Sequence, residues 1–169
     1  SETAELADIH LALRPGTDAL LLRTMISIIF EEGLHDRAYL DEHADGFAEI
    51  VPWFAGFDVR GALRVCELDY DLVARAAREF ARRRSVLLDD LGILMNRHSA
   101  LVSYLIVVLL TICGRIGVPG GNQLDVWGHA APDDPKAWRT PVTGIPALNG
   151  TFPPNVLPEE ILSDHPERV

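Results

Sequence analysis

A short turn near the start of the chain contains residue types that could bind a nucleotide. It consists of Arg14, Pro15, Gly16, Thr17 and Asp18. Glycine lets a backbone approach a ligand closely, and the free N–H groups at the start of a helix attract anions. An aspartate carboxylate can accept two hydrogen bonds, from the ring N–H and the exocyclic amine of guanine. The turn therefore fits a nucleotide site, although a Gly-Thr-Asp sequence is also typical of an ordinary helix cap.

The other side chains that could do chemistry form weaker patterns. The six histidines are scattered, and no pair of them has the helical spacing of metal ligands with a carboxylate partner. Asp89 and Asp90 are adjacent, so their carboxylates are expected to point apart into solvent. The chain contains no P-loop, no GxGxxG and no GxSxG sequence. We therefore expect no catalytic residue and no metal ligand in this segment, and a nicotinamide-binding domain is disfavoured.

The elements around the turn are expected to be a strand and a helix. Apolar and polar residues alternate over residues 8–13, which is typical of a strand. Pro15 cannot continue a strand ladder, and Thr17 has a side chain suited to an N-cap. We predict that a helix follows over residues 18–32 and that Gly33 ends it.

The remaining pattern is mostly helical. Helices are predicted over residues 37–43, twice within residues 47–63, over residues 68–84 and over residues 98–113. Residues 85–88 form a short apolar run after a helix, as expected of a buried parallel strand. The predicted fold class is therefore α/β: a partial, dinucleotide-binding-like parallel sheet flanked by helices, helix-rich overall. Two strands are too few for a complete sheet, which suggests that part of it lies in sequence outside this chain.

Proline marks a change of organisation toward the C-terminus. Eight of the 11 prolines lie after residue 129, and such a stretch cannot form long regular elements. We predict an α/β segment over residues 1–128 and an extended, irregular, Pro-rich tail or linker over residues 129–169. One helical turn is expected within that tail, at residues 158–162.

Composition excludes several classes of partner. The formal net charge is −10, which disfavours nucleic acid and anionic membrane surfaces. The longest apolar run, residues 101–112, has about half the length of a membrane span, and no signal-peptide pattern opens the chain. We expect a cytoplasmic protein without a membrane span. Cys66 and Cys113 lie far apart in sequence, so we expect buried free thiols rather than a zinc or iron–sulfur site.

A series of sequence pieces, in a fixed order, resembles the large subunits of the molybdopterin oxidoreductase family. That family includes formate dehydrogenases, nitrate reductases and dimethyl sulfoxide reductase. The resemblance covers residues 2–122, and its pieces are residues 3–8, 13–20 and 29–36, then Gly92 with His98 six residues later, and finally residues 110–122. Each piece is unspecific by itself, but the ordered set is fairly specific.

The resemblance implies a cofactor and a set of site residues. In such enzymes two molybdopterin guanine dinucleotides hold a molybdenum or tungsten ion, and their guanosine ends lie in an α/β region. Carried onto this chain, Gly16, Thr17 and Asp18 would contact one guanosine, with the aspartate on the guanine edge. The loop from Gly92 to His98 would border the cofactor, and Arg97 could meet one of its phosphates. The metal ligand and an iron–sulfur cluster lie upstream in the family, so this segment alone is expected to be inactive.

One loop departs from the family pattern and leaves a second hypothesis open. Where the family commonly has Gly-Met-Gly and then Gln-His, this chain has Ile93, Leu94 and Arg97 at the changed positions. The segment could therefore be a cofactor-free structural or interaction domain of the same fold family. Its partners would be the remaining domains of the parent polypeptide, or a second copy bound through the apolar surface of residues 101–112.

Overall fold

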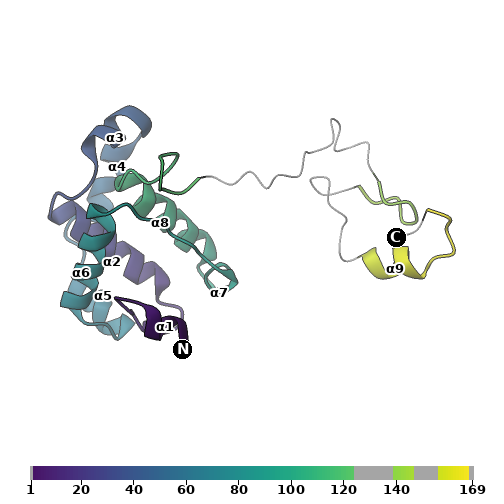
Figure 1. The fold of residues 1–169 in the computed structure, drawn as a ribbon, viewed down its shortest axis with the longest axis horizontal. Coiled ribbons are helices and arrows are strands. Elements are labelled where there is room, and N and C mark those ends of the chain that lie inside the picture. Colours follow the sequence, from purple (N-terminus) through teal and green to yellow (C-terminus); the bar gives the residue numbers. More distant parts are fainter. Residues whose placement is uncertain (1, 124–138, 147–155, 168–169) are drawn as a thin grey trace. The chain divides into compact units, whose positions relative to one another are not determined.

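The computed structural model describes residues 2–123, 139–146 and 156–167 (Figure 1). The chain divides into two compact units, Ser1–Leu124 and Asp125–Val169, and each is described by itself. Much of the tail predicted for residues 129–169 lies outside the described residues. The boundary proposed near residue 128 stays a prediction.

The first unit is built from helices. Their bounds are α1 Glu2–Leu6, α2 Asp18–Glu31, α3 Arg37–His43, α4 Phe47–Ile50, the 3-10 helix η1 Val51–Trp53, α5 Val59–Cys66, α6 Tyr70–Arg82, α7 Leu91–Leu94 and α8 Ser99–Ile112. The helices predicted over residues 18–32, 37–43, 68–84 and 98–113 are thus confirmed as α2, α3, α6 and α8. The short α7 lies in a stretch that we expected to be a loop.

Local chemistry explains where several of these helices begin and end. Asp36, Asp58 and Asp69 precede α3, α5 and α6, and each side chain accepts the amide N–H three residues later, at 3.0, 2.8 and 3.0 Å. Gly33 follows α2 with a φ of +64°, a conformation that favours glycine and stops the helix. These starts and ends are visible in the sequence because each depends on neighbouring residues.

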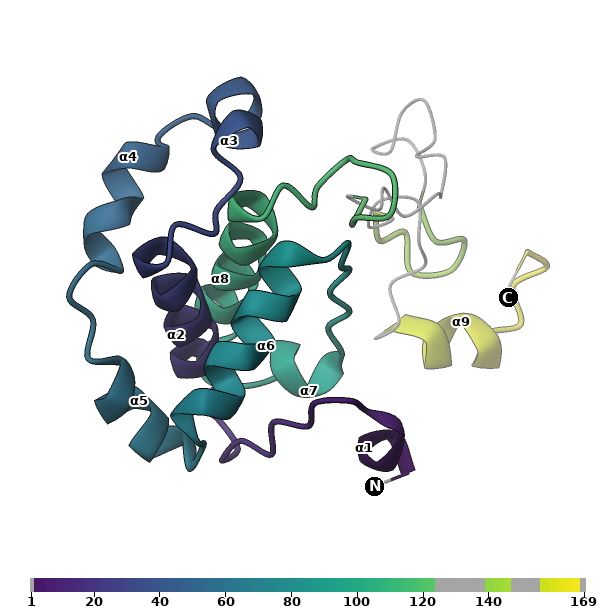
Figure 2. The same ribbon diagram turned by 60° about the vertical axis from the view of Figure 1, so that its left-hand side comes forward.

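The core of the unit surrounds α2, which packs against α5, α6 and α8 (Figure 2). Ile26, Ile28 and Ile29 of α2 are fully or almost fully buried, as are Val73 of α6 and Leu109 of α8. Removing such side chains from water is the main stabilising contribution that a small helical unit has.

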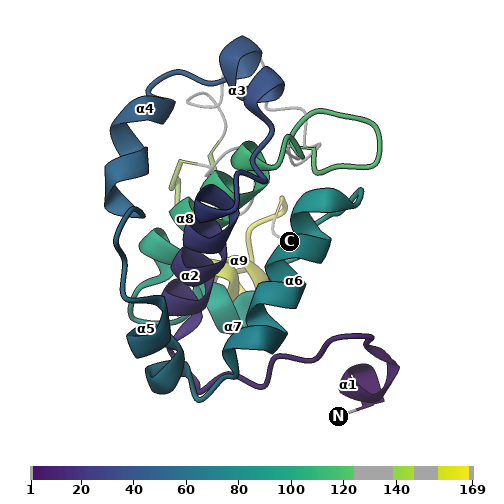
Figure 3. The same cartoon turned by 90° about the vertical axis from the view of Figure 1, so that its left-hand side faces the viewer.

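Helices α2 and α8 lie side by side and run in the same direction (Figure 3). Near their starts, Ala19 packs against a cluster that contains Val102. Just past their ends, the Asp36 amide donates to the Ile112 carbonyl at 2.8 Å. The N-termini of both helices therefore lie at one end of the pair.

The predicted α/β fold with a parallel sheet is wrong for the part of the chain that the structure describes, where every named element is a helix. Residues 8–13 and 85–88 are not helical, but neither segment pairs with another strand. A strand needs a neighbouring ladder to satisfy its N–H and C=O groups, and alternation of residues alone does not supply one. The described residues make isolated bridges only, Ile116 with Asn122 and Arg139 with Pro146.

Within residues 85–88, backbone hydrogen bonds are made to a side chain and not to a neighbouring strand. The Asn122 amide accepts the Leu87 N–H at 2.9 Å and donates to the Leu87 carbonyl at 2.8 Å. Nearby, the Arg115 guanidinium donates to the Ala81 and Arg83 carbonyls at 2.9 and 2.7 Å, which caps the C-terminal end of α6. Residues 115–122 thus hold the chain where it leaves α6.

The second unit contains α9, Leu157–Leu162, which confirms the helical turn predicted at residues 158–162. Its Glu160 side chain is buried and accepts the amides of Val142 and Thr143 at 3.1 and 2.8 Å. Burial alone would raise the pKa of Glu160, but these hydrogen bonds and that of the Thr143 hydroxyl outweigh it and lower the pKa below its ordinary value.

Among the described residues, no helix combines the length and the apolar composition that crossing a membrane requires. The cytoplasmic location expected from the sequence stays a prediction.

Candidate functional site

The turn before α2 has the exposed backbone that a ligand site needs. Gly16 is exposed with a φ of +83°, and no heavy atom lies within 4 Å of where a β-carbon would stand. The amide N–H groups of Gly16, Asp18 and Ala19 have no acceptor within residues 2–123. The turn therefore offers three free donors around the start of a helix, where negative charge is favoured.

Thr17 has a different role from the predicted N-cap. Its side chain is buried, and its hydroxyl donates to the Arg14 carbonyl at 2.6 Å instead of accepting an amide of α2. Its backbone carbonyl accepts the Cys66 thiol at 3.8 Å. The hydroxyl proton is thus committed within the turn, and Thr17 fixes the turn's shape against the end of α5.

Asp18 is the first residue of α2 and is partly exposed. Its carboxylate makes no hydrogen bond and no ion pair with any residue that the structure describes. A carboxylate without an internal partner keeps all its acceptor positions for water or a ligand. Asp18 is therefore the group in this turn best able to recognise a paired N–H donor set, such as the edge of guanine.

The second predicted group, Gly92, Arg97 and His98, lies on α7 and at the start of α8. All three residues are exposed, and Gly92 lies within α7 rather than in an open loop. The His98 amide donates to the Asn96 side chain at 2.7 Å, and the described part of the chain contains no partner for the Arg97 guanidinium. Arg97 is therefore free to pair with an anion.

Both predicted groups lie at the end of the unit where α2 and α8 begin. Ala19, next to Asp18, and Ile93, next to Gly92, pack against one cluster formed by Val102, Ile106 and Leu110. No hydrogen bond or ion pair joins the two groups in the described ranges. The structure thus brings them to one end of a helix pair without direct contact between them.

Several side chains that shape this unit gave no signal in the sequence. Arg23 donates to the Trp53 carbonyl at 2.6 Å, and its guanidinium lies 4.1 Å from the centre of the Phe57 ring. Arg115 and Asn122 hold the segment that follows α6, as described above. Their partners are 30 or more residues away, so no local pattern could have revealed them.

Residues 2–123, 139–146 and 156–167 contain no group of three His, Cys, Asp or Glu side chains placed to hold a metal ion. Cys66 and Cys113 are buried and not joined to each other. Burial raises the pKa of both thiols, that of Cys113 to about 12.

Comparison with known proteins finds relatives of much greater length. No family model matches the chain. A trimethylamine-N-oxide reductase of Salmonella typhi is 30% identical over 119 residues, which are 67% of this chain and 14% of the relative. A nitrate reductase of Symbiobacterium thermophilum is 30% identical over 136 residues, which are 75% of this chain and 18% of the relative.

A solved structure shares the fold of about two thirds of this chain. Acetylene hydratase from Pelobacter acetylenicus matches with a TM-score of 0.65 and 28% identity, over 68% of this chain and 16% of that protein's chain. The chain therefore spans less than a fifth of the length of each of these relatives. Two of the three relatives are oxidoreductases by name, and this chain corresponds to a fragment of them.

Proposed function

This chain is related to a segment of the molybdopterin oxidoreductase family, and from that premise we propose that it helps to bind the guanosine end of a molybdopterin guanine dinucleotide. The longer polypeptide in which it would act is called the parent enzyme below. That enzyme would be a molybdenum- or tungsten-dependent oxidoreductase, like the reductases to which this chain is similar.

The observation that carries the proposal is the carboxylate of Asp18 at the start of α2, which has no partner among the residues that the structure describes. Two acceptor oxygens match the ring N–H and exocyclic amine of guanine, a pairing that no other natural base offers in the same form. The free N–H groups of Gly16 and Ala19 lie on either side of Asp18 in sequence and could bind the ribose or a phosphate oxygen. Thr17 keeps these groups in place through its bond to the Arg14 carbonyl.

Gly92, Arg97 and His98 would form the second side of the site. Arg97 would pair with a phosphate, because a guanidinium presents several donors in a plane that matches phosphate oxygens. Gly92 and His98 are exposed at the same end of the unit and would border the cofactor without holding a metal.

The bound cofactor would supply two-electron redox chemistry at its metal. We propose that the metal ligand and the iron–sulfur cluster implied by the resemblance lie in other parts of the parent enzyme. In this segment the residues bind and orient a nucleotide end, so the segment alone is not catalytic.

One observation favours the alternative of a cofactor-free structural or interaction domain. Ile93, at one of the positions where this chain departs from the family pattern, packs against the cluster of Val102, Ile106 and Leu110 on α8 instead of standing free beside a ligand. A domain of this kind would keep the fold but contact only other parts of the parent enzyme.

The test is the amount of guanine released by acid from purified parent enzyme that carries Asp18→Asn. An asparagine keeps the size of the side chain but replaces one acceptor oxygen with a donor that faces the guanine donors. Hydrogen bonds to charged groups contribute about 1.5–3 kcal/mol, so we expect guanine affinity to fall roughly 10- to 150-fold.

Asp71→Asn is the matched control, because Asp71 is likewise an acidic, exposed residue in the first turn of a helix. That variant should keep the full guanine content. Full guanine content in Asp18→Asn would reject the guanosine role and leave the interaction domain as the better account.

A further inference from the structure

The exposed face of α8 is unlike the exposed faces of the neighbouring helices. The 14 residues of α8 include no Asp, Glu, Lys or Arg. Leu101, Tyr104 and Val107 follow one another at three-residue intervals on this helix and are 49, 43 and 46% exposed. Helix α6, by contrast, exposes charged residues such as Arg75 and Arg82. A helix that is apolar on all sides is typical of one buried on all sides.

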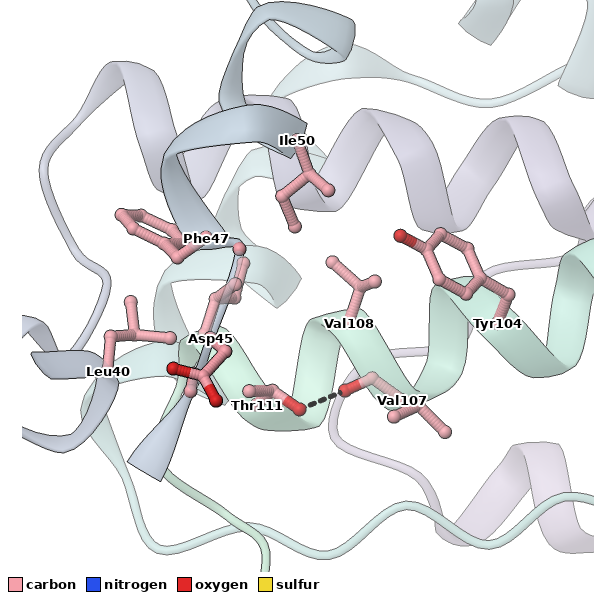
Figure 4. Close-up of a pocket in the computed structure, with 11 residues that line it drawn as sticks. Leu40, Asp45, Phe47, Ile50, Tyr104, Val107, Val108 and Thr111 are labelled. Carbon is pink, nitrogen blue, oxygen red and sulfur yellow. Dashed lines mark hydrogen bonds between the residues drawn. The ribbon is translucent and has the colours of Figure 1, made fainter. Parts of the chain in front are cut away.

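Two cavities lie beside this face. A cavity of about 400 Å³ lies on one side of Tyr104, walled by the start of α2, by Trp53 and by Leu101. A cavity of about 170 Å³ lies on its other side, where Val108 points toward Ile50 (Figure 4). Tyr104 lines both cavities. We call the face of Leu101, Tyr104 and Val107, with these two cavities, the α8 groove.

The walls of the groove are held in place before anything binds. Trp53, at the rim, is 62% exposed, yet its carbonyl accepts the Arg23 guanidinium at 2.6 Å. Arg23 in turn lies against the Phe57 ring. In the smaller cavity the Thr111 hydroxyl donates to the Val107 carbonyl at 2.7 Å, so it presents no free donor to the groove. Apart from Asp45, which lines the smaller cavity, the groove is therefore a mostly apolar surface that is formed before anything binds.

We propose that the α8 groove is covered by an apolar segment of the parent enzyme from outside residues 1–169. This inference rests on the parent-enzyme part of the proposed function and not on guanosine binding. In these relatives, 82% or more of the length lies outside the part that matches this chain. The covering segment could belong to that remaining sequence.

The size of the groove favours that occupant over a second copy of the chain. A stable dimer buries about 800 Å² of surface on each partner. Trp53, Leu101, Tyr104 and Val107 are about half exposed, and even a whole large aromatic side chain offers only about 150–250 Å². A segment of the same polypeptide needs less contact area, because it does not lose the freedom of a separate molecule on binding.

The test compares the rates at which introduced cysteines react with a maleimide in the parent enzyme, folded and unfolded in urea. Leu101→Cys and Val107→Cys report on the groove. Val65→Cys is the control, because Val65 is 48% exposed on α5, away from the groove. Because Cys66 and Cys113 are buried only in the folded chain and also react in urea, labelling is followed at each introduced cysteine separately by peptide mass spectrometry. For each position we take the ratio of the labelling rate in the unfolded enzyme to the rate in the folded enzyme. We expect this ratio to be at least tenfold larger at positions 101 and 107 than at position 65.

Equal slowing at all three positions, or none, would overturn the proposal. Protection at positions 101 and 107 that disappears on dilution would assign the groove to a second copy instead. A native reading frame that encodes nothing beyond these residues would also overturn it. Labelling repeated on cofactor-free protein separates the two proposals, because the groove should stay protected whether or not guanine is bound.

Discussion

Thr17 and Asp18 are neighbours in sequence, but their polar atoms have different partners. The Thr17 hydroxyl is buried and bonded to the Arg14 carbonyl, while the Asp18 carboxylate has no partner among the described residues. A side chain whose polar atoms are satisfied internally contributes to shape, and one whose atoms are free can select a ligand. At the scale of single residues, the recognition proposed for this turn would therefore depend on Asp18.

The two thiols should be chemically inert in the folded chain. Burial raises the pKa of Cys113 to about 12 and also raises that of Cys66. At pH 8 roughly one Cys113 thiol in ten thousand would be a thiolate, the form that reacts. We expect no alkylation by iodoacetamide within an hour under native conditions and complete alkylation of both cysteines in urea, followed by mass spectrometry. Rapid modification of one thiol in the native protein would contradict this prediction.

Glu160 should make the second unit sensitive to acid. Hydrogen bonds from residues 142 and 143 lower its pKa, so it stabilises the folded unit above the ordinary carboxyl pKa. That contribution is lost as the pH falls through the lowered pKa. We expect amide exchange at Val142 and Thr143, corrected for its intrinsic pH dependence, to accelerate as Glu160 is protonated.

Glu160→Gln provides the comparison for that measurement. Glutamine places the NH2 donor of its side-chain amide against the backbone N–H donors of Val142 and Thr143. Hydrogen exchange of these two backbone amides should therefore already be fast at pH 7 and show no acid step. Glu159→Gln, an exposed neighbour on α9, should behave as the natural chain does. An acid step that persists in Glu160→Gln would mean that another group is responsible.

At the scale of elements, the segment after α6 depends on one amide side chain. Asn122 both accepts from and donates to the backbone of Leu87. In Asn122→Asp the donor is lost and a carboxylate oxygen faces the Leu87 carbonyl. We expect the free energy of unfolding to fall by about 1–3 kcal/mol, measured by urea denaturation. Gln123→Glu, an equal change of charge at the exposed next residue, should change stability little.

The elements also show what local sequence can and cannot predict. Helix α3 was predicted with its bounds because its Asp36 cap and its residues are contiguous. The strand predicted over residues 85–88 is wrong, because pairing depends on residues far away in sequence. Here the side chain of Asn122, and not a second strand, hydrogen-bonds to the backbone of Leu87. Of the predicted site residues, Gly16 is exposed and Asp18 partly exposed, and their part in binding stays a prediction, whereas Arg23 and Asn122 gave no local signal.

At the scale of the whole molecule, the proposed function places the metal ligand and the iron–sulfur cluster in parts of the parent enzyme outside this chain. We predict that the isolated 169-residue chain, supplied with a reduced or an oxidised dye, turns over neither nitrate, trimethylamine N-oxide nor formate. Under the proposed function, the residues of this chain would bind a nucleotide end and pack against other parts of the parent enzyme rather than react. Turnover above that of a heat-treated sample would show that a catalytic centre lies within these residues.

The parallel course of α2 and α8 has a consequence for the order in which the first unit folds. Two helices joined by a short turn pack antiparallel. For α2 and α8 to pack parallel, the chain between them must first return from the end of α2 to the end where α2 begins. Residues that meet across it, such as Ala19 and Val102, are therefore distant in sequence. Contacts of that kind form after the entropy of a long loop has been lost, which slows folding. The pairing of α7 with α8, which are neighbours in the chain, should precede the pairing of α2 with α8, so the surface that would receive a nucleotide is among the last parts of the unit to be completed.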